Sequence, residues 1–222
     1  MRALFGLVAL LSVVGGASAR EVRTDDVTFR VDPPAGYCEF DKTIKRENDY
    51  LTNMGNAQAG AGNSLIAIFP DCQELAAYRA RNETLVTRLL IVATTSNLGK
   101  SQTDLVDQVC QSYKEEGKKL LAQTDPKSKA LMKKHLAGDL ASDVFLGVLE
   151  NKPGVCYSGQ ITKIRSDGKE TTVLNVFAAT LLRNSLIFIY SYKPYSDANS
   201  VQPNLANLKT IYTGLAAANA AQ

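Results

Sequence analysis

The chain has 222 residues, of which 45% are hydrophobic and 21% charged, and these proportions exclude a wholly disordered protein. Its formal net charge of +3 is too small for the basic stripe expected of a nucleic-acid-binding protein. A single histidine also excludes the metal sites that need several histidine ligands.

The first nineteen residues have the features of a cleaved export signal. Arg2 precedes an apolar run over 3–14, which has the length of a signal h-region and is too short to span a bilayer. Ala17-Ser18-Ala19 then provides an A-x-A cleavage site. A buried N-terminal helix is the alternative. We predict a signal peptide at 1–19 and one domain over 20–222, periplasmic or secreted and without a transmembrane anchor.

All four cysteines follow this signal. In an oxidising compartment their even number indicates disulfide bonds, although more than one pairing is possible. We favour Cys38–Cys72 and Cys110–Cys156, because each pair can join elements that we expect to be neighbours. Free buried thiols and a metal site are the alternatives, but no C-x-x-C motif is present.

Strands and helices alternate through the first two thirds of this domain. Apolar or β-branched runs predict strands at 27–31, 37–40, 64–69 and 87–94. Apolar residues at helical spacing predict helices at 47–59, 72–81 and 101–122, and a short one after Asp125. The nearly all-apolar run over 64–69 is expected to be a central strand buried on both faces. Asp71 is expected to cap the helix that follows it.

The last third of the chain predicts a meander. Strand patterns occur at 143–150, 155–165, 169–182 and 185–192. Short turns at 166–168 and 183–184 require antiparallel neighbours. Apolar residues at helical spacing predict a last helix at 204–217, with a frayed tail over 216–222. The predicted fold class is α+β: an antiparallel sheet with helices packed on its faces, and a C-terminal meander followed by a terminal helix.

The order of these elements resembles the PsbP/Mog1-like fold. Separately, segments 33–41 (PPAGYCEFD) and 68–72 (IFPDC) look like parts of uncharacterised exported bacterial proteins. PsbP/Mog1-like members include photosystem subunits, small-GTPase partners and bacterial envelope proteins, and no catalytic motif unites them. The resemblance therefore implies a fold and a compartment, but no activity.

The common catalytic arrangements fit this sequence poorly. A serine or cysteine hydrolase needs a base beside its nucleophile, usually histidine. His135 directly follows Lys133 and Lys134, two cations that oppose its protonation, and no G-x-S-x-G motif occurs. Segment 94–101 departs from the P-loop pattern, because Thr94 stands where the first glycine is required. We predict no catalytic residue, no metal ligand and no cofactor.

Four tyrosines offer a candidate binding surface, because a tyrosine ring is apolar and its hydroxyl is polar. Tyr190 and Tyr192 share one face of the last strand, Tyr195 follows that strand, and Tyr37 lies beside the Pro-Pro-Ala-Gly turn. The simpler explanation, which we favour, is that Tyr190, Tyr192 and Tyr195 pack under the terminal helix and that Tyr37 is a packing residue, with a groove wall as its alternative role.

We therefore predict a non-enzymatic periplasmic accessory or binding protein of the cell envelope. Its partner is expected to be an unknown envelope protein or a small apolar ligand. The alternative is an exported hydrolase whose active site has no recognisable motif.

Overall fold

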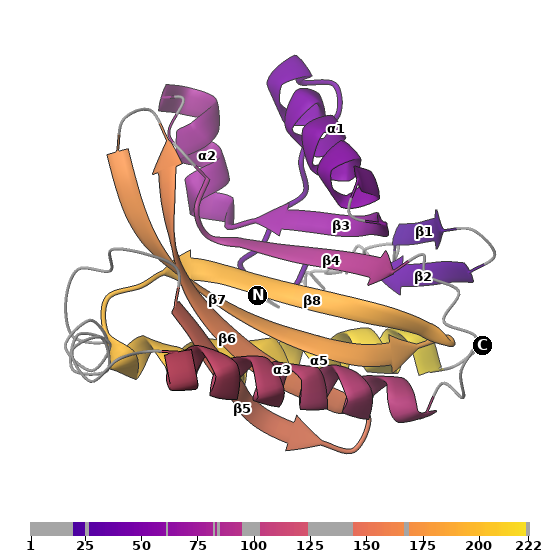
Figure 1. Ribbon diagram of the computed structural model, residues 1–222. Coiled ribbons are helices and arrows are strands. Elements are labelled where there is room, and N and C mark those ends of the chain that lie inside the picture. The colour runs from indigo at the N-terminus through magenta and orange to yellow at the C-terminus, as the bar shows by residue number, and fades with distance from the viewer. Residues whose placement is uncertain are drawn as a thin grey trace, which may run out of the picture.

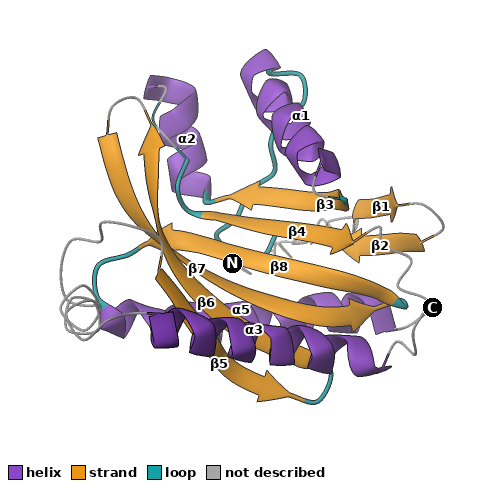
Figure 2. Ribbon diagram, in the orientation of Figure 1, coloured by secondary structure: helices purple, strands orange, loops and turns teal. Residues whose placement is uncertain are grey.

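The computed structural model of the chain describes residues 20–24, 27–60, 62–81, 83, 85–94, 103–123, 144–166 and 169–220. Two antiparallel sheets form its framework (Figures 1 and 2). The small sheet pairs β1 (Arg20–Thr24) with β2 (Val27–Val31). The large sheet has six strands, in the spatial order β3 (Asn63–Pro70), β4 (Arg88–Thr94), β8 (Ser185–Pro194), β7 (Lys169–Leu182), β6 (Val155–Ser166) and β5 (Val144–Lys152).

Helices cover both faces of the large sheet. They are α1 (Lys45–Gly60), α2 (Cys72–Arg81), α3 (Thr103–Gln123) and α5 (Val201–Ala220), and a short 3-10 helix (Ala198–Ser200) leads into α5. One face, here called the α5 face, packs against α5 and β2. The opposite face, here called the α1–α3 face, packs against α1, α2 and α3. This arrangement confirms the predicted α+β class, with its C-terminal meander and terminal helix.

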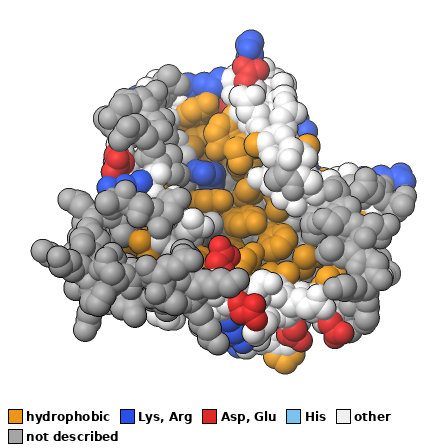
Figure 3. Space-filling view, in the orientation of Figure 1, with side chains coloured by type: hydrophobic (Ala, Val, Ile, Leu, Met, Phe, Trp, Pro, Cys, Tyr) orange, Lys and Arg blue, Asp and Glu red, His pale blue; other side chains and the backbone are white. Residues whose placement is uncertain are grey.

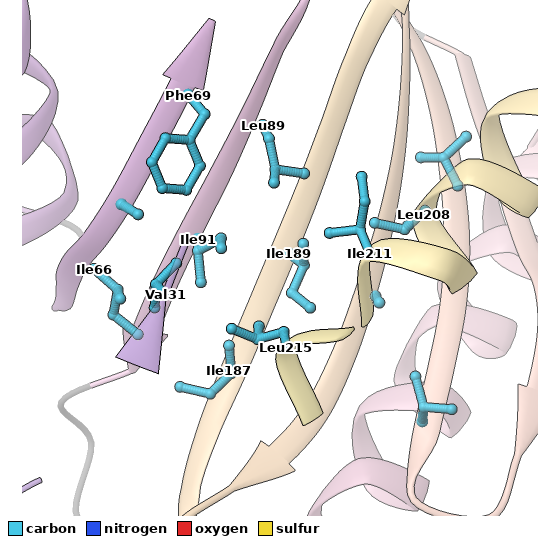
Figure 4. Packing of buried hydrophobic residues seen from close by; sticks show 14 of the residues in the cluster. Val31, Ile66, Phe69, Leu89, Ile91, Ile187, Ile189, Leu208, Ile211 and Leu215 are labelled. Atoms are coloured by element: carbon cyan, nitrogen blue, oxygen red, sulfur yellow. The ribbon is translucent and has the colours of Figure 1, made fainter. Parts of the chain in front are cut away.

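The alternation of side chains along β8 explains how one strand serves both faces. Successive residues of a strand point to opposite sides. Ile187 and Ile189 belong to the cluster on the α5 face, whereas Phe188 packs against the clusters on the α1–α3 face. Figure 4 shows Ile187 and Ile189 beside Leu215 of α5. Ile189 is fully buried, and burial of such a side chain stabilises the fold by roughly 1.5–3 kcal/mol.

Two local features predicted from the sequence are present in the structure: the cap at the start of α2 and the short turn between β7 and β8. Asp71 Oδ1 accepts hydrogen bonds from the backbone N–H groups of Gln73 and Glu74, at 2.8 and 3.1 Å, so Asp71 caps α2 as predicted. Arg183 and Asn184, with φ of 49° and 62°, form the turn between β7 and β8. Positive φ at both central residues is typical of a type I′ turn, whose twist suits a two-residue hairpin.

The structure corrects three expectations. The strand over 64–69 is β3, which lies at an edge of the sheet rather than at its centre. Its buried part is covered by α1 and α2 on one side and by β2 on the other. The apolar run therefore correctly indicated burial, but burial does not determine the position of a strand within the sheet. The strand over 37–40 is reduced to one isolated bridge, between Tyr37 and Asp71.

The third correction concerns the C-terminal tail. Residues 216–220 are helical rather than frayed, because α5 continues to Ala220. The amide of Asn219 binds both backbone groups of Arg30: Oδ1 accepts from the N–H and Nδ2 donates to the C=O, each at 2.9 Å. These two bonds attach the last turn of α5 to β2.

Several predicted features lie outside the described residues. They are the signal peptide at 1–19, the short helix after Asp125, His135, and the 167–168 part of the turn between β6 and β7. Within the described part of the chain, no helix has both the length and the apolar composition that crossing a membrane requires.

Candidate functional site

Two disulfide bonds hold the helices of the α1–α3 face to other elements. Cys38 pairs with Cys72 and Cys110 pairs with Cys156, and the Cα–Cα distances are 5.0 and 5.5 Å. The first bond ties the segment after β2 to the start of α2, and the second ties α3 to β6. This is the pairing favoured from the sequence. Such bonds are consistent with a protein that resides outside the cytoplasm.

A cavity of about 340 Å³ lies on the α5 face, between α5 and the chain that leaves β2. Its apolar walls come from three elements that are distant in sequence. They are Val31, Pro33, Pro34, Ile91, Ile211 and Leu215. Figure 4 labels four of these side chains, Val31, Ile91, Ile211 and Leu215, within the packed core.

A tight turn after β2 shapes one wall. The backbone N–H of Tyr37 donates to the carbonyl of Pro34 at 2.9 Å, and Gly36 has φ of +85°. Glycine at the third position of a type II turn meets this requirement without strain. Pro33 and Pro34 cannot donate to a strand ladder, so pairing stops at Val31 and the segment is free to follow α5.

The other wall is one side of α5. Asn207, Ile211, Gly214 and Ala218 are spaced at three or four residues, which places them on the same side of a helix. A Cβ atom built on Gly214 would meet nothing within 4 Å, so the space beside this glycine is open. Glycine within a helix costs about 1 kcal/mol relative to alanine.

Two buried donors at the cavity have no hydrogen-bond partner among the described residues. They are Nε of Arg30 and Nδ2 of Asn207, two residues that line the cavity, but neither atom has accessible surface, so neither faces the cavity itself. A buried donor left without a partner costs about 1–3 kcal/mol. Asp32 is the acid among the lining residues; it is exposed, and its Oδ1 accepts from the backbone N–H of Arg20 at 3.2 Å.

A short polar row lies under α5 next to this cavity. Ser191 Oγ donates to Asn204 Oδ1 at 2.8 Å, and both residues are buried. The hydroxyl of Tyr37 lies close to Ser191 and Asn207, but neither contact has the geometry of a hydrogen bond. Burial raises the pKa of Tyr37, and the charges of nearby carboxylates add to this effect. Tyr37 therefore stays a neutral phenol beneath the helix.

The four predicted tyrosines do not form one surface. Tyr195 packs on the α5 face, as expected, and Tyr37 packs against the same cluster. Tyr190 and Tyr192 lie on the α1–α3 face, so the expectation that they pack under the terminal helix is wrong. The reason is register: Ser191 points toward α5, and its two neighbours must therefore point away.

Tyr190 and Tyr192 belong to a half-buried aromatic row on the α1–α3 face. Their ring centroids are 6.3 Å apart, and Phe188 continues the row at 6.1 Å from Tyr190. The guanidinium of Arg88 lies 4.3 Å from the ring centroid of Tyr192. Burial raises the pKa of Tyr190. In Figure 3 hydrophobic side chains gather between α1 and α2 and continue across the strands below.

A second hollow, of about 590 Å³, lies between α1 and the edge strand β3. Its lining includes the exposed residues Arg23 and Lys42, and Arg20, which forms an ion pair with Glu39 at 3.7 Å. The cavity beneath α5 has a mostly apolar lining, whereas the second hollow is lined by polar and apolar groups about equally, so the cavity beneath α5 is the stronger candidate for an apolar ligand.

Sequence reasoning missed Arg30, Asn207 and Gly214. A glycine inside the predicted helix 204–217 was the one local signal, because such a position often has a packing or functional reason.

Comparison with known proteins finds no family model and no curated protein that matches this chain.

Proposed function

We propose that this chain is an exported, non-enzymatic binding protein of the bacterial cell envelope, which holds a small apolar ligand in the cavity beneath α5. One observation carries the proposal: a cavity of about 340 Å³ with mostly apolar walls lies between α5 and the chain that leaves β2. Pockets for small molecules typically have volumes of about 300–1,000 Å³, mostly apolar walls and a few polar groups.

Two further features support a location in the periplasm. The sequence of residues 1–19 has the pattern of a cleaved export signal. The disulfides Cys38–Cys72 and Cys110–Cys156 are of the kind that persists in oxidising compartments.

The composition of the cavity favours binding over hydrolysis. Thr210 has the single hydroxyl among the described lining residues, and this hydroxyl donates to the carbonyl of Ala206 at 3.2 Å. Histidine and cysteine are not among those lining residues, and Asp32 is their single acid. A hydrolase would need a nucleophile with a base in reach.

Gly214 offers a direct test, with 1-octanol as the probe in isothermal titration calorimetry. Gly214 lines the cavity and is exposed, so the leucine side chain of Gly214→Leu should narrow it, and we expect octanol affinity to fall at least about tenfold. The variant should be no less stable than the wild type, because leucine is a better helix former than glycine.

Gly55→Leu is the matched control. Gly55 lies within α1, also has open space around a built Cβ, and is not part of this cavity. We expect Gly55→Leu to bind octanol as the wild type does. Failure of the wild type to bind octanol, or undiminished binding by Gly214→Leu, would contradict the proposed function.

A further inference from the structure

The hollow between α1 and β3 opens at the edge of the large sheet. Six consecutive residues of β3, 63–68, contribute to its lining. Leu65 and Ile68 pack on the α1–α3 face, whereas Ile66 and Ala67 belong to the cluster on the α5 face. A hollow over one face would contact side chains of that face only, because strand residues point to opposite sides. The hollow therefore extends around the edge of β3, which pairs only with β4 in the described sheet.

One side of this hollow is apolar. Leu51, Gly55 and Ala59 of α1 are spaced at four residues, which places them on the same side of the helix. Leu51 and Leu65 are half-buried, so each keeps surface that a ligand can reach. Figure 1 shows α1 beside β3, and β1 next to the end at which β3 begins. Apolar surface on α1 and β3 is therefore available to a ligand.

The charged residues of the described lining are all basic. They are Arg20 and Arg23 of β1 and Lys42, which lies between β2 and α1. Arg23 and Lys42 are exposed, and the side chain of Arg20 is 40% exposed. These cations come from two segments of the chain, so they surround the opening rather than follow one strand. An anion at the opening would therefore meet an excess of positive charge.

Three acids that are adjacent to these segments in sequence do not line the hollow. They are Glu21, Glu39 and Asp41. Glu39 forms an ion pair with Arg20 at 3.7 Å, but an exposed pair of this kind is weak. Asp41 Oδ1 accepts from the backbone N–H and the hydroxyl of Thr43, at 2.9 and 2.6 Å, so it is bound to its own turn.

We infer that this hollow is a second ligand site, which binds an anionic amphiphile. Its headgroup lies toward Arg23 and Lys42, and its hydrocarbon chain lies toward Leu51 and Leu65. Polar and apolar groups contribute about equally to the lining, as such a ligand requires. A volume of about 590 Å³ holds about twenty non-hydrogen atoms, at roughly 30 Å³ each as in liquid water. Decyl phosphate is smaller than this limit and serves as the probe.

The test compares decyl phosphate with decyltrimethylammonium and inorganic phosphate by calorimetry on the mature chain, below the micelle concentration. We expect decyl phosphate to bind at least about tenfold more tightly than either of the others. Its affinity should fall as salt is added, because salt screens attraction between exposed charges. Equal binding of decyltrimethylammonium would overturn the preference for an anion. Equal binding of inorganic phosphate would overturn the role of the apolar side.

Two glycine variants separate this site from the cavity beneath α5. Gly55 lines the hollow, is half-buried, and has open space around a built Cβ, so Gly55→Leu should weaken decyl phosphate binding at least about tenfold. Gly214→Leu is the matched control and should bind decyl phosphate as the wild type does, because Gly214 is outside the hollow. Undiminished binding by Gly55→Leu would overturn the inference, whatever octanol does in the cavity beneath α5.

A charge reversal tests the basic residues. Lys42→Glu should weaken decyl phosphate binding at least about tenfold, because it places an anion at the opening. Lys114→Glu is the control, since Lys114 is exposed on α3 and lies outside the hollow. It changes the net charge equally and should leave the affinity unchanged. Equal losses in the two variants would show a general effect of net charge and overturn the site.

Vesicles identify the source of the ligand, because a phosphate with a hydrocarbon chain can be free or belong to a membrane lipid. Cosedimentation with phosphatidylglycerol vesicles, weakened by both Gly55→Leu and Lys42→Glu, would assign the site to a lipid held in a membrane. Binding of decyl phosphate without binding to vesicles would assign it to a free amphiphile. If neither decyl phosphate nor vesicles bind, the inference is wrong, and the proposed function is unaffected.

Discussion

Glu47 of α1 and Arg79 of α2 are joined by two hydrogen bonds, from Nε to Oε1 at 2.7 Å and from Nη2 to Oε2 at 2.9 Å. Glu47 is completely buried, and its Oε2 also accepts from the backbone N–H of Asp41 at 2.7 Å. The side chain of Arg79 is 41% exposed. The pair therefore connects the two helices that cover β3 and β4, with its acid inside and its base at the surface.

Removal of the base should destabilise the fold more than removal of a surface charge. We expect Arg79→Ala to lower the free energy of unfolding by about 2–3 kcal/mol, because it leaves a buried carboxylate without its partner. This loss of stability is smaller than the loss expected for a fully buried ion pair, because solvent screens the exposed part of Arg79.

Urea denaturation measures the change, and Lys45→Ala is the control. Lys45 forms an ion pair with Asp49 at 2.6 Å, but both side chains are largely exposed, so we expect a loss below about 0.5 kcal/mol. Equal losses in the two variants would show that the Glu47–Arg79 pair has no special role.

Acid should weaken the same pair. The hydrogen bond from Arg79 holds the pKa of Glu47 below its ordinary value of 4.5, although burial opposes this shift. A depressed pKa in the folded state adds stability that is present above the unfolded value and is lost as the pH falls through the folded value. The pKa of Glu150 is lowered in the same way, by Lys152 and then Lys209.

We therefore expect the free energy of unfolding of the wild type to decrease as the pH falls from about 6 to about 3. Glu47→Gln should be less stable at the upper end of this range and should lose less stability on acidification. Urea titrations at several pH values measure both slopes. Parallel curves for the two proteins would contradict the assignment to Glu47.

The two disulfides should differ in their resistance to reductant. Cys110 and Cys156 are 1% and 0% exposed, whereas Cys38 and Cys72 are only half-buried. We expect a limited amount of reductant to open Cys38–Cys72 first in the native protein, because a thiolate must reach the sulfur atom that it attacks.

Alkylation followed by peptide mass spectrometry identifies the opened bond. In denaturant the difference should disappear, since burial is then lost. Preferential labelling of Cys110 and Cys156 in the native protein would contradict the packing of α3 on β6. Labelling of all four cysteines without any reductant would show that neither disulfide bond is present in the protein.

Much of the fold could be predicted because its signals are local. The strands of the meander follow from alternating apolar residues, and the short turn at Arg183 and Asn184 forces β7 and β8 to be antiparallel. Asp71 marks the start of α2 because its side chain bonds to residues that directly follow it. The favoured cysteine pairing also agrees with the structure, because it joins elements that the predicted order places near each other.

The candidate site could not be predicted in this way. Its walls come from β2 and α5, which lie near opposite ends of the described chain, and Asn219 attaches the last turn of α5 to the backbone of Arg30. Similarly, Tyr190 and Tyr195 are both compatible with packing under a helix, and only strand register places them on opposite faces.

By itself, the sequence therefore determined the secondary structure of most segments, the α+β class and the residues that had to be buried. These depend on interactions between residues close together in the chain and on the periodicity of apolar side chains. Only the tertiary structure decided that β3 is an edge strand, which face each tyrosine occupies, and that a mostly apolar cavity lies beneath α5. A buried residue is apolar whether a helix or another strand covers it, so its sequence does not show which element lies against it. Long-range packing decides which element covers each face.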